Sequence, residues 1–441
     1  MNVIPNVSGI PIIGSALELF GDIRAFFTAQ YLQHGPVYRV KALHHRFTVL
    51  AGLDANVFTI RHGKHHFRSK ETWQQQDIVF GARRSLVSMD GADHIYLRKK
   101  QKRGYSRGMI ELNIPQTIKI AQHEIQQWPV NQSLPGLYSM QKIITEQLGR
   151  TIADFSPKEY LDDLVYFIRT VQTTTVTKQR PRFFRYTPRF YRAHRRILAM
   201  GQKVIDNHLQ YPPEDRPQNL IGDILSLARE DPEFLPASDI MVAILGPFAA
   251  GLDTAASATT FVLYALLKHP DLMADVTSEV DSVFGRGELT PSRIKECDLL
   301  HRTILETMRM YPTAPALQRT VTKPFEFGDY TIQANEPIII ASTVPHYLAE
   351  IYPNPEIFDI DRYTPHRKEN RQPGSYAPFG LGPHTCIGAG FAETQIMLTI
   401  ATLLHQTELA LAPKDYHLHI DPIPTPSPDR HFRFKVLRHR H

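Results

Sequence analysis

Phe379-Gly380-Leu381-Gly382-Pro383-His384-Thr385-Cys386-Ile387-Gly388 contains one of only two cysteines in this chain of 441 residues. The glycines permit positive φ angles and a close approach of the backbone. An apolar stretch with helical character, residues 389–404, follows directly. Backbone N–H groups and the positive end of that helix would favour a thiolate at Cys386. The loop therefore predicts a soft anionic ligand, of the kind that an axial thiolate to haem iron requires; the alternative is an inert, buried thiol.

Other motifs lie upstream of this loop, and their order favours a haem ligand over an inert thiol at Cys386. The pattern F-x-x-G-x-x-x-C-x-G resembles the haem-binding loop of the cytochrome P-450 family. Residues 250–254 (A-G-L-D-T) match the family's A/G-G-x-D/E-T, and residues 306–309 (E-T-M-R) match its E-x-x-R. The resemblance covers essentially the whole chain. It implies haem b with Cys386 as the metal ligand, and cofactor contacts from the loop residues Phe379, Gly380, His384 and Gly388.

The expected fold is mainly α with a small β component. By resemblance it is the cytochrome P-450 fold, with haem between a long central helix and the cysteine-bearing loop and helix. Because no Gly/Ser tract, repeat or long like-charge block marks a linker, residues 1–441 are expected to form a single haem domain. Its parts are an N-terminal β-rich portion at about 30–65, a helical body at about 85–310, and a core-helix and haem-loop region at about 291–405.

Local patterns place several elements. Residues 34–40 and 46–50 alternate and carry β-branched side chains, which predicts a β-hairpin. Ser238 is a plausible N-cap for the long helix, and a later helix should run from about Pro291 to Met310. Residues 241–267 carry one charge, Asp253, and are long enough to span a bilayer. Because an acid in mid-span is costly in lipid, we expect a buried core helix instead.

The A-G-L-D-T motif is expected to carry the proton chemistry. Gly251 would let the helix open and, with Ala250, bring the cofactor close to the backbone. Thr254 would offer a hydroxyl, and Asp253 would relay protons through water to oxygen bound at the iron. In the alternative, Thr254 bonds back to an upstream carbonyl and Asp253 forms a salt bridge elsewhere.

Four basic side chains are candidates for binding the haem propionates. His94 and Arg98 lie four apart on one helical face and resemble the family's H-x-x-x-R clamp. Arg319 matches another propionate-contacting position, and His384 stands where the family usually has Arg or His. The charge of His384 depends on pH. Each residue alone would be read as a solvated cation.

Glu306 and Arg309, taken alone, form an ordinary helical surface pair of opposite charges. The resemblance instead makes Glu306, Arg309 and Arg362 a charged network with an architectural role, which locks the core around the haem loop.

The residues that line the substrate pocket are the part of the site that the sequence predicts least directly. By resemblance the pocket is lined by Phe248, Ala249, Ala314 and Leu317, together with the segments 73–86, 155–184 and 423–427. These are mainly apolar and hydroxyl side chains, which favours a lipophilic small-molecule substrate.

Composition limits the partners and the compartment. The formal charge is +6, with basic runs at 98–103 and 178–196 but no nucleic-acid-binding motif, so no nucleic acid is expected. Few cysteines and a start without a charged or apolar leader indicate a cytoplasmic protein, with peripheral membrane contact at most; the alternative is a protein whose N-terminal membrane anchor was removed. A monomer is expected.

These expectations combine into a haem-thiolate monooxygenase. It would activate O₂ with two electrons, drawn from NAD(P)H through a separate ferredoxin or flavodoxin-type donor, and hydroxylate or epoxidise its substrate. The 98–103 run suits an acidic donor. Two alternatives stay open: a peroxide-driven or rearranging haem-thiolate enzyme, and a non-catalytic haem-binding sensor or scaffold.

Overall fold

The structure, a computed structural model, describes residues 3–440, and helices dominate it. The α-helices are α1 Ala16–Leu19, α2 Ile23–His34, α3 Leu53–His66, α4 Lys70–Val79, α5 Gly91–Gln101, α6 Arg107–Glu111, α7 Ile114–Gln126, α8 Gly136–Ala153, α9 Leu161–Thr175, α10 Pro188–Leu209, α11 Leu220–Glu230, α12 Ala237–Lys268, α13 Pro270–Phe284, α14 Pro291–Ile294, α15 Asp298–Met310 and α16 Ala389–Gln406. The strands are β1 Val37–Ala42, β2 His45–Ala51, β3 Phe67–Arg68, β4 Ser133–Pro135, β5 Leu317–Val321, β6 Phe325–Phe327, β7 Tyr330–Ile332, β8 Pro337–Ala341, β9 Thr407–Leu411, β10 Ile420–Asp421, β11 Ser427–Pro428 and β12 Arg433–His439.

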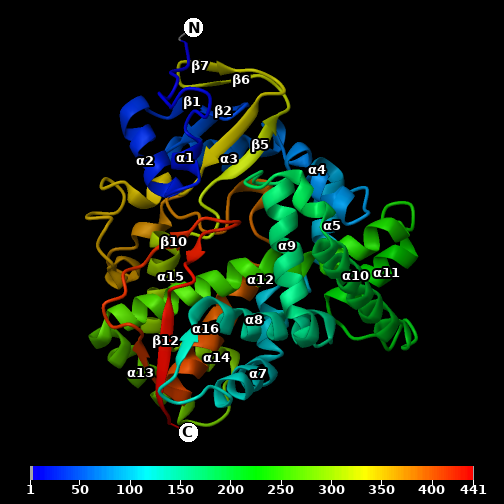
Figure 1. The fold of residues 1–441 in the computed structure, drawn as a ribbon, viewed down its shortest axis with the longest axis vertical. Helices are drawn as coiled ribbons and strands as arrows, with labels where there is room; N and C mark the ends of the chain where they lie inside the picture. The colour runs from blue at the N-terminus through cyan, green and yellow to red at the C-terminus, as the bar shows by residue number, and fades with distance from the viewer. Residues whose placement is uncertain (1–2, 441) are drawn as a thin grey trace.

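The largest sheet lies at the end of the molecule where the chain begins (Figure 1). Its strand order is β1-β2-β8-β5-β3, with β2 and β8 parallel and the other pairs antiparallel. The predicted hairpin is present as β1 and β2, and buried side chains on both strands pack into the core. Because β5 and β8 come from residues 317–341, the sheet ties the start of the chain to the segment before the cysteine loop.

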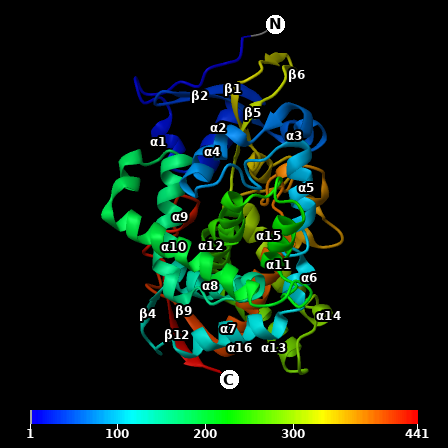
Figure 2. The same ribbon diagram turned by 90° about the vertical axis from the view of Figure 1, so that its right-hand side faces the viewer.

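Helix α12 runs through the middle of the helical body, as two perpendicular views show (Figures 1 and 2). It packs against α8, α15 and α16, and most of its residues are buried in the main hydrophobic core. This agrees with the mainly helical fold that the sequence predicts.

Two boundaries differ from the prediction. Helix α12 begins at Ala237, one residue before the predicted cap Ser238, whose hydroxyl bonds to Asp239 instead. The single helix expected from Pro291 to Met310 is two helices, because the chain turns at residues 295–297 before α15 begins. Cys297 stands at this turn and is fully buried, consistent with a structural thiol.

Two segments, Ala237–Lys268 and Gly382–Gln406, are long and apolar enough to cross a membrane by length and composition alone. More than half of the apolar 18-residue window of each segment is buried inside the fold. Core helices of globular proteins pass the same test.

Candidate active site

The cysteine loop is shaped by two glycines with positive φ. Gly380 has φ +73° and Gly382 has φ +69°. A side chain on Gly382 would place its Cβ 2.9 Å from the carbonyl oxygen of Thr59 on α3, so only glycine fits there. The turn closes where the Cys386 amide donates to the Phe379 carbonyl at 2.8 Å. Helix α16 then begins directly after Gly388.

The Cys386 side chain is accessible, yet the fold surrounds it closely enough to change its acidity. Burial raises the pKa of the thiol, while the N–H of Gly388 and the guanidinium of Arg98 oppose that rise. One expected backbone donor, the Gly388 N–H, is therefore present, and in the protein alone the thiol is the favoured form. Binding to a metal cation would favour the thiolate.

Helix α12 presents one accessible face within an otherwise buried helix. Ala243, Gly246, Ala250 and Thr254 retain accessible surface at helical spacing, as do Ala249 and Gly251 beside them, whereas the other residues from 242 to 255 are buried. Ala250 and Thr254 belong to the motif identified in the sequence. They face the open side of the helix.

Gly251 has a packing role that the sequence analysis did not predict. A Cβ on Gly251 would lie 3.0 Å from Leu148 Cδ1, so the glycine lets α8 pack closely against α12. The contact of its backbone with a cofactor stays a prediction. The space beside Gly246 is more open, because a Cβ there would meet only Tyr105 Oη, at 3.8 Å.

The two polar side chains of the motif take the alternative arrangement. Thr254 Oγ1 donates to the Ala250 carbonyl at 2.5 Å. The Asp253 carboxylate is buried and accepts two bonds from Arg169, at 2.8 and 3.0 Å. Gln141 Nε2 also donates to it, at 2.6 Å. In this conformation Asp253 is committed to α8 and α9, so its proton-relay role stays a prediction that requires release from Arg169.

Tyr105 lies between the cysteine loop and α12, and sequence reasoning missed it. Its ring is 3.7 Å from where a Cβ on Gly388 would stand, and its hydroxyl approaches Gly246. Burial, with the nearby Cys386 as a second cause, shifts the pKa of the Tyr105 phenol upward, so the phenol stays protonated. The only available signal was its position after the 98–103 basic run, which is too weak to assign a role.

The four predicted cations gather beside the loop. His94 stacks on His384 with ring centroids 4.0 Å apart. Burial, then His384 and Arg98, lower the pKa of His94 to about 4. Burial likewise lowers the pKa of Arg319 to about 10. A cavity beside the loop is lined by His94, Arg319 and His384.

The surroundings of Arg319 show whether a cofactor with carboxylate groups, such as haem, fits this cavity. The Arg319 guanidinium donates to the neighbouring Gln318 carbonyl at 2.6 Å, and within residues 3–440 no carboxylate lies within 4.0 Å of it. A half-buried cation without a counter-anion is costly, so a bound carboxylate would relieve it. With an accessible thiol nearby, the residues present fit haem. His384 is less free, because its Nε2 lies 3.0 Å from Asp90 Oδ1 and 3.1 Å from Ser69 Oγ.

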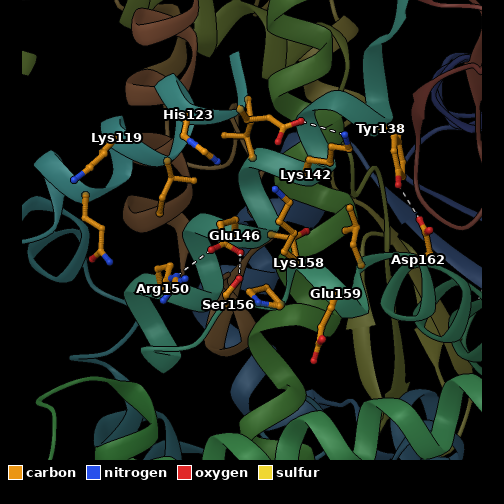
Figure 3. A pocket seen from close by; sticks show the side chains of 17 residues that line it. Lys119, His123, Tyr138, Lys142, Glu146, Arg150, Ser156, Lys158, Glu159 and Asp162 are labelled. Atoms are coloured by element: carbon orange, nitrogen blue, oxygen red, sulfur yellow. Dashed lines mark hydrogen bonds and ion pairs between the residues drawn. The ribbon is translucent and has the colours of Figure 1, made fainter. Parts of the chain in front are cut away.

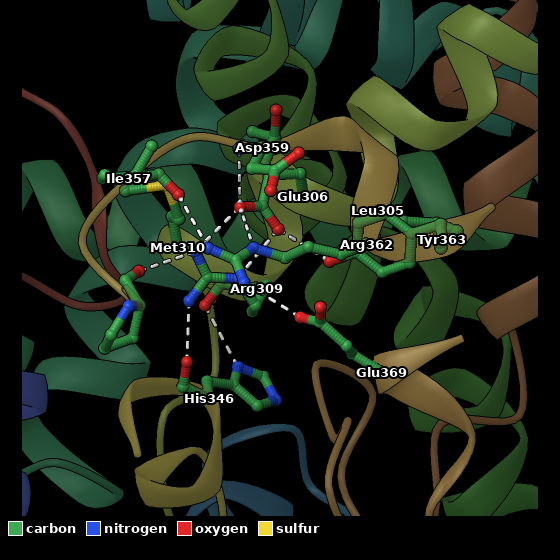
Figure 4. A network of polar contacts seen from close by, with 12 residues as sticks. Leu305, Glu306, Arg309, Met310, His346, Ile357, Asp359, Arg362, Tyr363 and Glu369 are labelled. Atoms are coloured by element: carbon green, nitrogen blue, oxygen red, sulfur yellow. Dashed lines mark hydrogen bonds and ion pairs between the residues drawn. The ribbon is translucent and has the colours of Figure 1, made fainter. Parts of the chain in front are cut away.

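Glu306, Arg309 and Arg362 form a fully buried network (Figure 4). Arg309 donates twice to Glu306 at 2.8 Å, and Arg362 Nε donates to it at 3.2 Å. Arg362 also pairs with Glu369 at 2.9 Å, and Tyr363 Oη donates to Glu306 at 2.8 Å. The network ties α15 to the segment 353–369, which leads into the cysteine loop. Its burial excludes the surface-pair alternative.

His346 extends this network and gives stability a pH dependence. Its Nδ1 donates to the Arg309 carbonyl at 3.0 Å, so Nε2 must be unprotonated to accept from the Ala377 N–H at 2.9 Å. Burial lowers the pKa of His346 to about 3, from an ordinary value of 6.5. The unfolded chain therefore binds a proton below pH 6.5 that the folded chain refuses until about pH 3.

We expect the free energy of unfolding to fall as pH drops from 6.5 towards 3, with His346 contributing up to about 1.4 kcal/mol per pH unit. His346→Gln can keep both hydrogen bonds without titrating and should show a flatter profile. Denaturant unfolding at stepped pH checks this. Parallel profiles for the two proteins would contradict it.

The segments predicted to line a substrate pocket do converge. A cavity of about 400 Å³ is lined by Trp73 and Val87, by residues 172 and 176–179, by residues 313–319, and by 422 and 424–426. Ala314 and Leu317 are part of this lining. Phe248 is not: it is buried in the main core. Ala249 is half-buried, and its carbonyl accepts from Gln172 at 3.2 Å.

A larger cleft, about 660 Å³, lies elsewhere, between α7, α8 and the start of α9 (Figure 3). Its charges mostly neutralise one another: Lys142 pairs with Glu124 at 3.2 Å, and Arg150 pairs with Glu146 at 2.9 Å. Part of the predicted pocket segment 155–184 lines this cleft, namely residues 156–159, 161 and 162, but none of the predicted catalytic or cofactor-binding residues does.

Comparison with known proteins agrees with this arrangement. The family model described as Cytochrome P450 matches residues 5–429. A sterol 14α-demethylase of Mycolicibacterium vanbaalenii is 31% identical over 50% of this chain, and cytochrome P450 4c21 of Blattella germanica is 29% identical over 50%. The chain spans about half the length of each of these two relatives. A putative cytochrome P450 139 of Mycobacterium tuberculosis is 25% identical over 88% of this chain and 91% of its own.

Solved structures share the fold. The cytochrome P450DA haem domain has a TM-score of 0.86 at 21% identity, covering 99% of this chain and 98% of that one. Cyanobacterial CYP120A1, solved with retinoic acid, has a TM-score of 0.86 at 21% identity and full coverage of both chains. At this identity the likeness establishes the fold alone.

Proposed function

Because the chain belongs to the cytochrome P450 family, we propose that it is a haem-thiolate monooxygenase acting on a lipophilic small molecule. One observation carries the proposal: the loop that holds an accessible cysteine also lines a cavity with Arg319, a half-buried arginine that pairs with no carboxylate of residues 3–440. That set of groups suits an iron porphyrin with anionic edges.

Each residue has a stated task. Cys386 would ligate the iron, with its negative charge held by the Gly388 N–H and Arg98. Arg98, Arg319 and His94 would hold the propionate edge. Haem bound there would supply activation of O₂ with two electrons taken up singly. The network of Glu306, Arg309 and Arg362 keeps the loop in place from behind.

Thr254 would position the proton at the open face of α12. Its hydroxyl proton is given to the Ala250 carbonyl, which leaves the oxygen lone pairs free to hold a water molecule. Asp253 would deliver protons to that water after leaving Arg169. General acid catalysis of this kind contributes about 10²-fold or more to a rate.

Replacing Thr254 with alanine should therefore lower the product formed per O₂ consumed by about tenfold or more, with peroxide released instead. The measurement pairs oxygen uptake with product and peroxide yields. Thr259→Ala, which removes a buried hydroxyl bonded to Ala255 on the same helix, is the control. Unchanged coupling in Thr254→Ala would contradict the role given to this hydroxyl.

The observed commitment of Asp253 to Arg169 favours keeping the peroxide-driven alternative as a second candidate. An enzyme that uses peroxide as its oxidant does not need Asp253 to deliver protons for the activation of O₂. Product formation supported by peroxide alone, and insensitive to Thr254→Ala, would select that alternative.

The lining of the 400 Å³ cavity supports a lipophilic substrate. Phe20, Ile23, Phe27 and Trp73 contribute apolar surface, and polar side chains such as Lys178 lie among them. A relative carries the name sterol 14α-demethylase, which fits the same class. Titrating haem-loaded protein with apolar and polar compounds tests this; tight binding of polar compounds only would reject it.

Electrons would come from NAD(P)H through a separate acidic ferredoxin or flavodoxin-type donor that docks at α5. In the 98–103 run, Lys100 pairs with Glu230 and Arg103 with Asp223. Lys99 and Lys102 are exposed, and no carboxylate of residues 3–440 pairs with them. Arg98 on the same helix acts on Cys386, so this surface is the one near the thiol.

Lys99→Glu/Lys102→Glu should slow reduction by such a donor at low salt by about tenfold, and salt should narrow the difference. Lys119→Glu/Lys158→Glu makes the same charge change in the larger cleft and serves as the control (Figure 3). Stopped-flow reduction measures both. Equal rates in the two variants would reject docking at α5.

A further inference from the structure

A second pocket, of about 410 Å³, opens between α9, the start of α10 and the β10–β11 turn. Three arginines line it: Arg169, Arg180 and Arg189. Arg169 is paired with Asp253, whereas Arg180 and Arg189 repel each other unless an anion joins them. The pocket is separate from the cavity at residues 313–319, although Pro424 lines both.

The acids of this pocket do not neutralise the arginines. Asp162 accepts from Tyr138 Oη at 2.9 Å (Figure 3). Asp421 accepts from the backbone N–H of Ile423 at 3.0 Å. Across the described chain, no carboxylate lies within 4.0 Å of Arg180 or Arg189.

Aromatic rings support both free arginines in place of acids. The Arg189 guanidinium carbon lies 4.1 Å from the centre of the Tyr166 ring, and that of Arg180 lies 5.7 Å from the centre of the Phe184 ring. Stacking holds each planar fork while its N–H groups stay available. Guanidinium forks bind carboxylates through paired hydrogen bonds.

We propose that this pocket binds the carboxylate of an amphipathic organic acid. Arg180 and Arg189 bind the carboxylate, and Val165, Ile423 and Pro424 contact the apolar body. The third arginine, Arg169, is the one that holds Asp253. Because Arg169 lines the same pocket, a carboxylate bound there also accepts from its guanidinium and competes with Asp253 for it.

This competition couples the pocket to the α12 motif. By linkage, whatever weakens the Arg169–Asp253 pair strengthens binding of the acid, and the acid in turn weakens the pair. The consequence for proton delivery rests on the proposed function, whereas the binding does not. Regulation by an organic acid would then operate through release of Asp253.

Decanoate is the probe, and decan-1-ol, of the same chain length, is its neutral counterpart. Calorimetry on the haem-loaded protein should show decanoate binding that Arg180→Gln/Arg189→Gln weakens about tenfold, while decanol binding stays unchanged. Arg192→Gln/Arg195→Gln, which removes two exposed arginines from the same helix, should change the affinity less than twofold. Equal weakening by both pairs, or none by the first, would overturn the site.

Asp253→Asn tests the competition without any activity measurement. Losing the carboxylate frees Arg169, so decanoate should bind about threefold tighter or more. Unchanged affinity in a variant with an unchanged melting temperature would overturn the coupling. If Asp253→Asn does not fold, Arg169→Gln should weaken decanoate binding, and unaltered binding would overturn it equally. The carbon monoxide spectrum, which tests the proposed function, depends on neither Arg180 nor Arg189, so the two failures are distinguishable.

Discussion

Glu306→Gln should yield a protein that loses several kcal/mol of folding free energy and is purified with little or no haem. Glutamine keeps the shape of the side chain but removes the one charge that Arg309 and Arg362 share. Among residues 3–440, only the carboxylate of Glu369 then remains paired with Arg362, and Arg309 is left with backbone carbonyls at His346 and Pro355. Breaking a buried ion pair from one side costs about 3–5 kcal/mol.

Denaturant unfolding and the ratio of haem absorbance to protein absorbance measure the two effects. Glu146→Gln is the matched control, because Glu146 pairs with Arg150 on a helix in the same way but near the surface. That pair should be worth less than about 1 kcal/mol. A Glu306→Gln protein with normal stability and a full complement of haem would show that the network is not what positions the loop.

Cys386→Ser should abolish the thiolate-ligated spectrum completely, even where some haem is retained. Serine has nearly the same size, so the loop keeps the Cys386 amide bond to Phe379 and the φ angles of Gly380 and Gly382. An alcohol is a far weaker and harder ligand than a thiolate, so the iron loses its anionic sulfur. Absorption spectra of the ferric and reduced proteins record the change.

Cys297→Ser is the control for this experiment. Cys297 is the other cysteine of the chain, and burial raises the pKa of its thiol to about 12, so it is held as a neutral group. Its variant should keep the full haem spectrum. A thiolate spectrum that survives in Cys386→Ser but disappears in Cys297→Ser would show that Cys297 is the iron ligand, and would contradict the role given to Cys386.

The parts of the site that sequence predicts are those built from short, rigid patterns. Gly380 and Gly382 with Cys386 define one loop, and Glu306 with Arg309 are one helical turn apart. Their recognition as a loop and a buried network came from the family's motif order, since the charged pair alone favours a surface position. The mainly helical fold follows from the same resemblance and from helical periodicity.

The parts of the site that the sequence does not predict depend on contacts between residues that are far apart in the chain. Asp253 is held by Arg169 and Gln141, which lie 84 and 112 residues away in the sequence. Neither residue belongs to a motif that the sequence analysis identified. Leu148 of α8 fills the space where a side chain on Gly251 would lie, so this glycine also serves close packing. No local pattern encodes these partners, because they are set by how α8, α9 and α12 pack.

The most direct test of the central claim is the absorbance spectrum of the purified, haem-loaded protein after reduction and exposure to carbon monoxide. If Cys386 supplies a thiolate to iron, the main absorption band of that complex moves to the long-wavelength position typical of thiolate ligation, and Cys386→Ser lacks it. A complex with the band of a histidine-ligated haem, or a protein that binds no haem at all, would contradict the account.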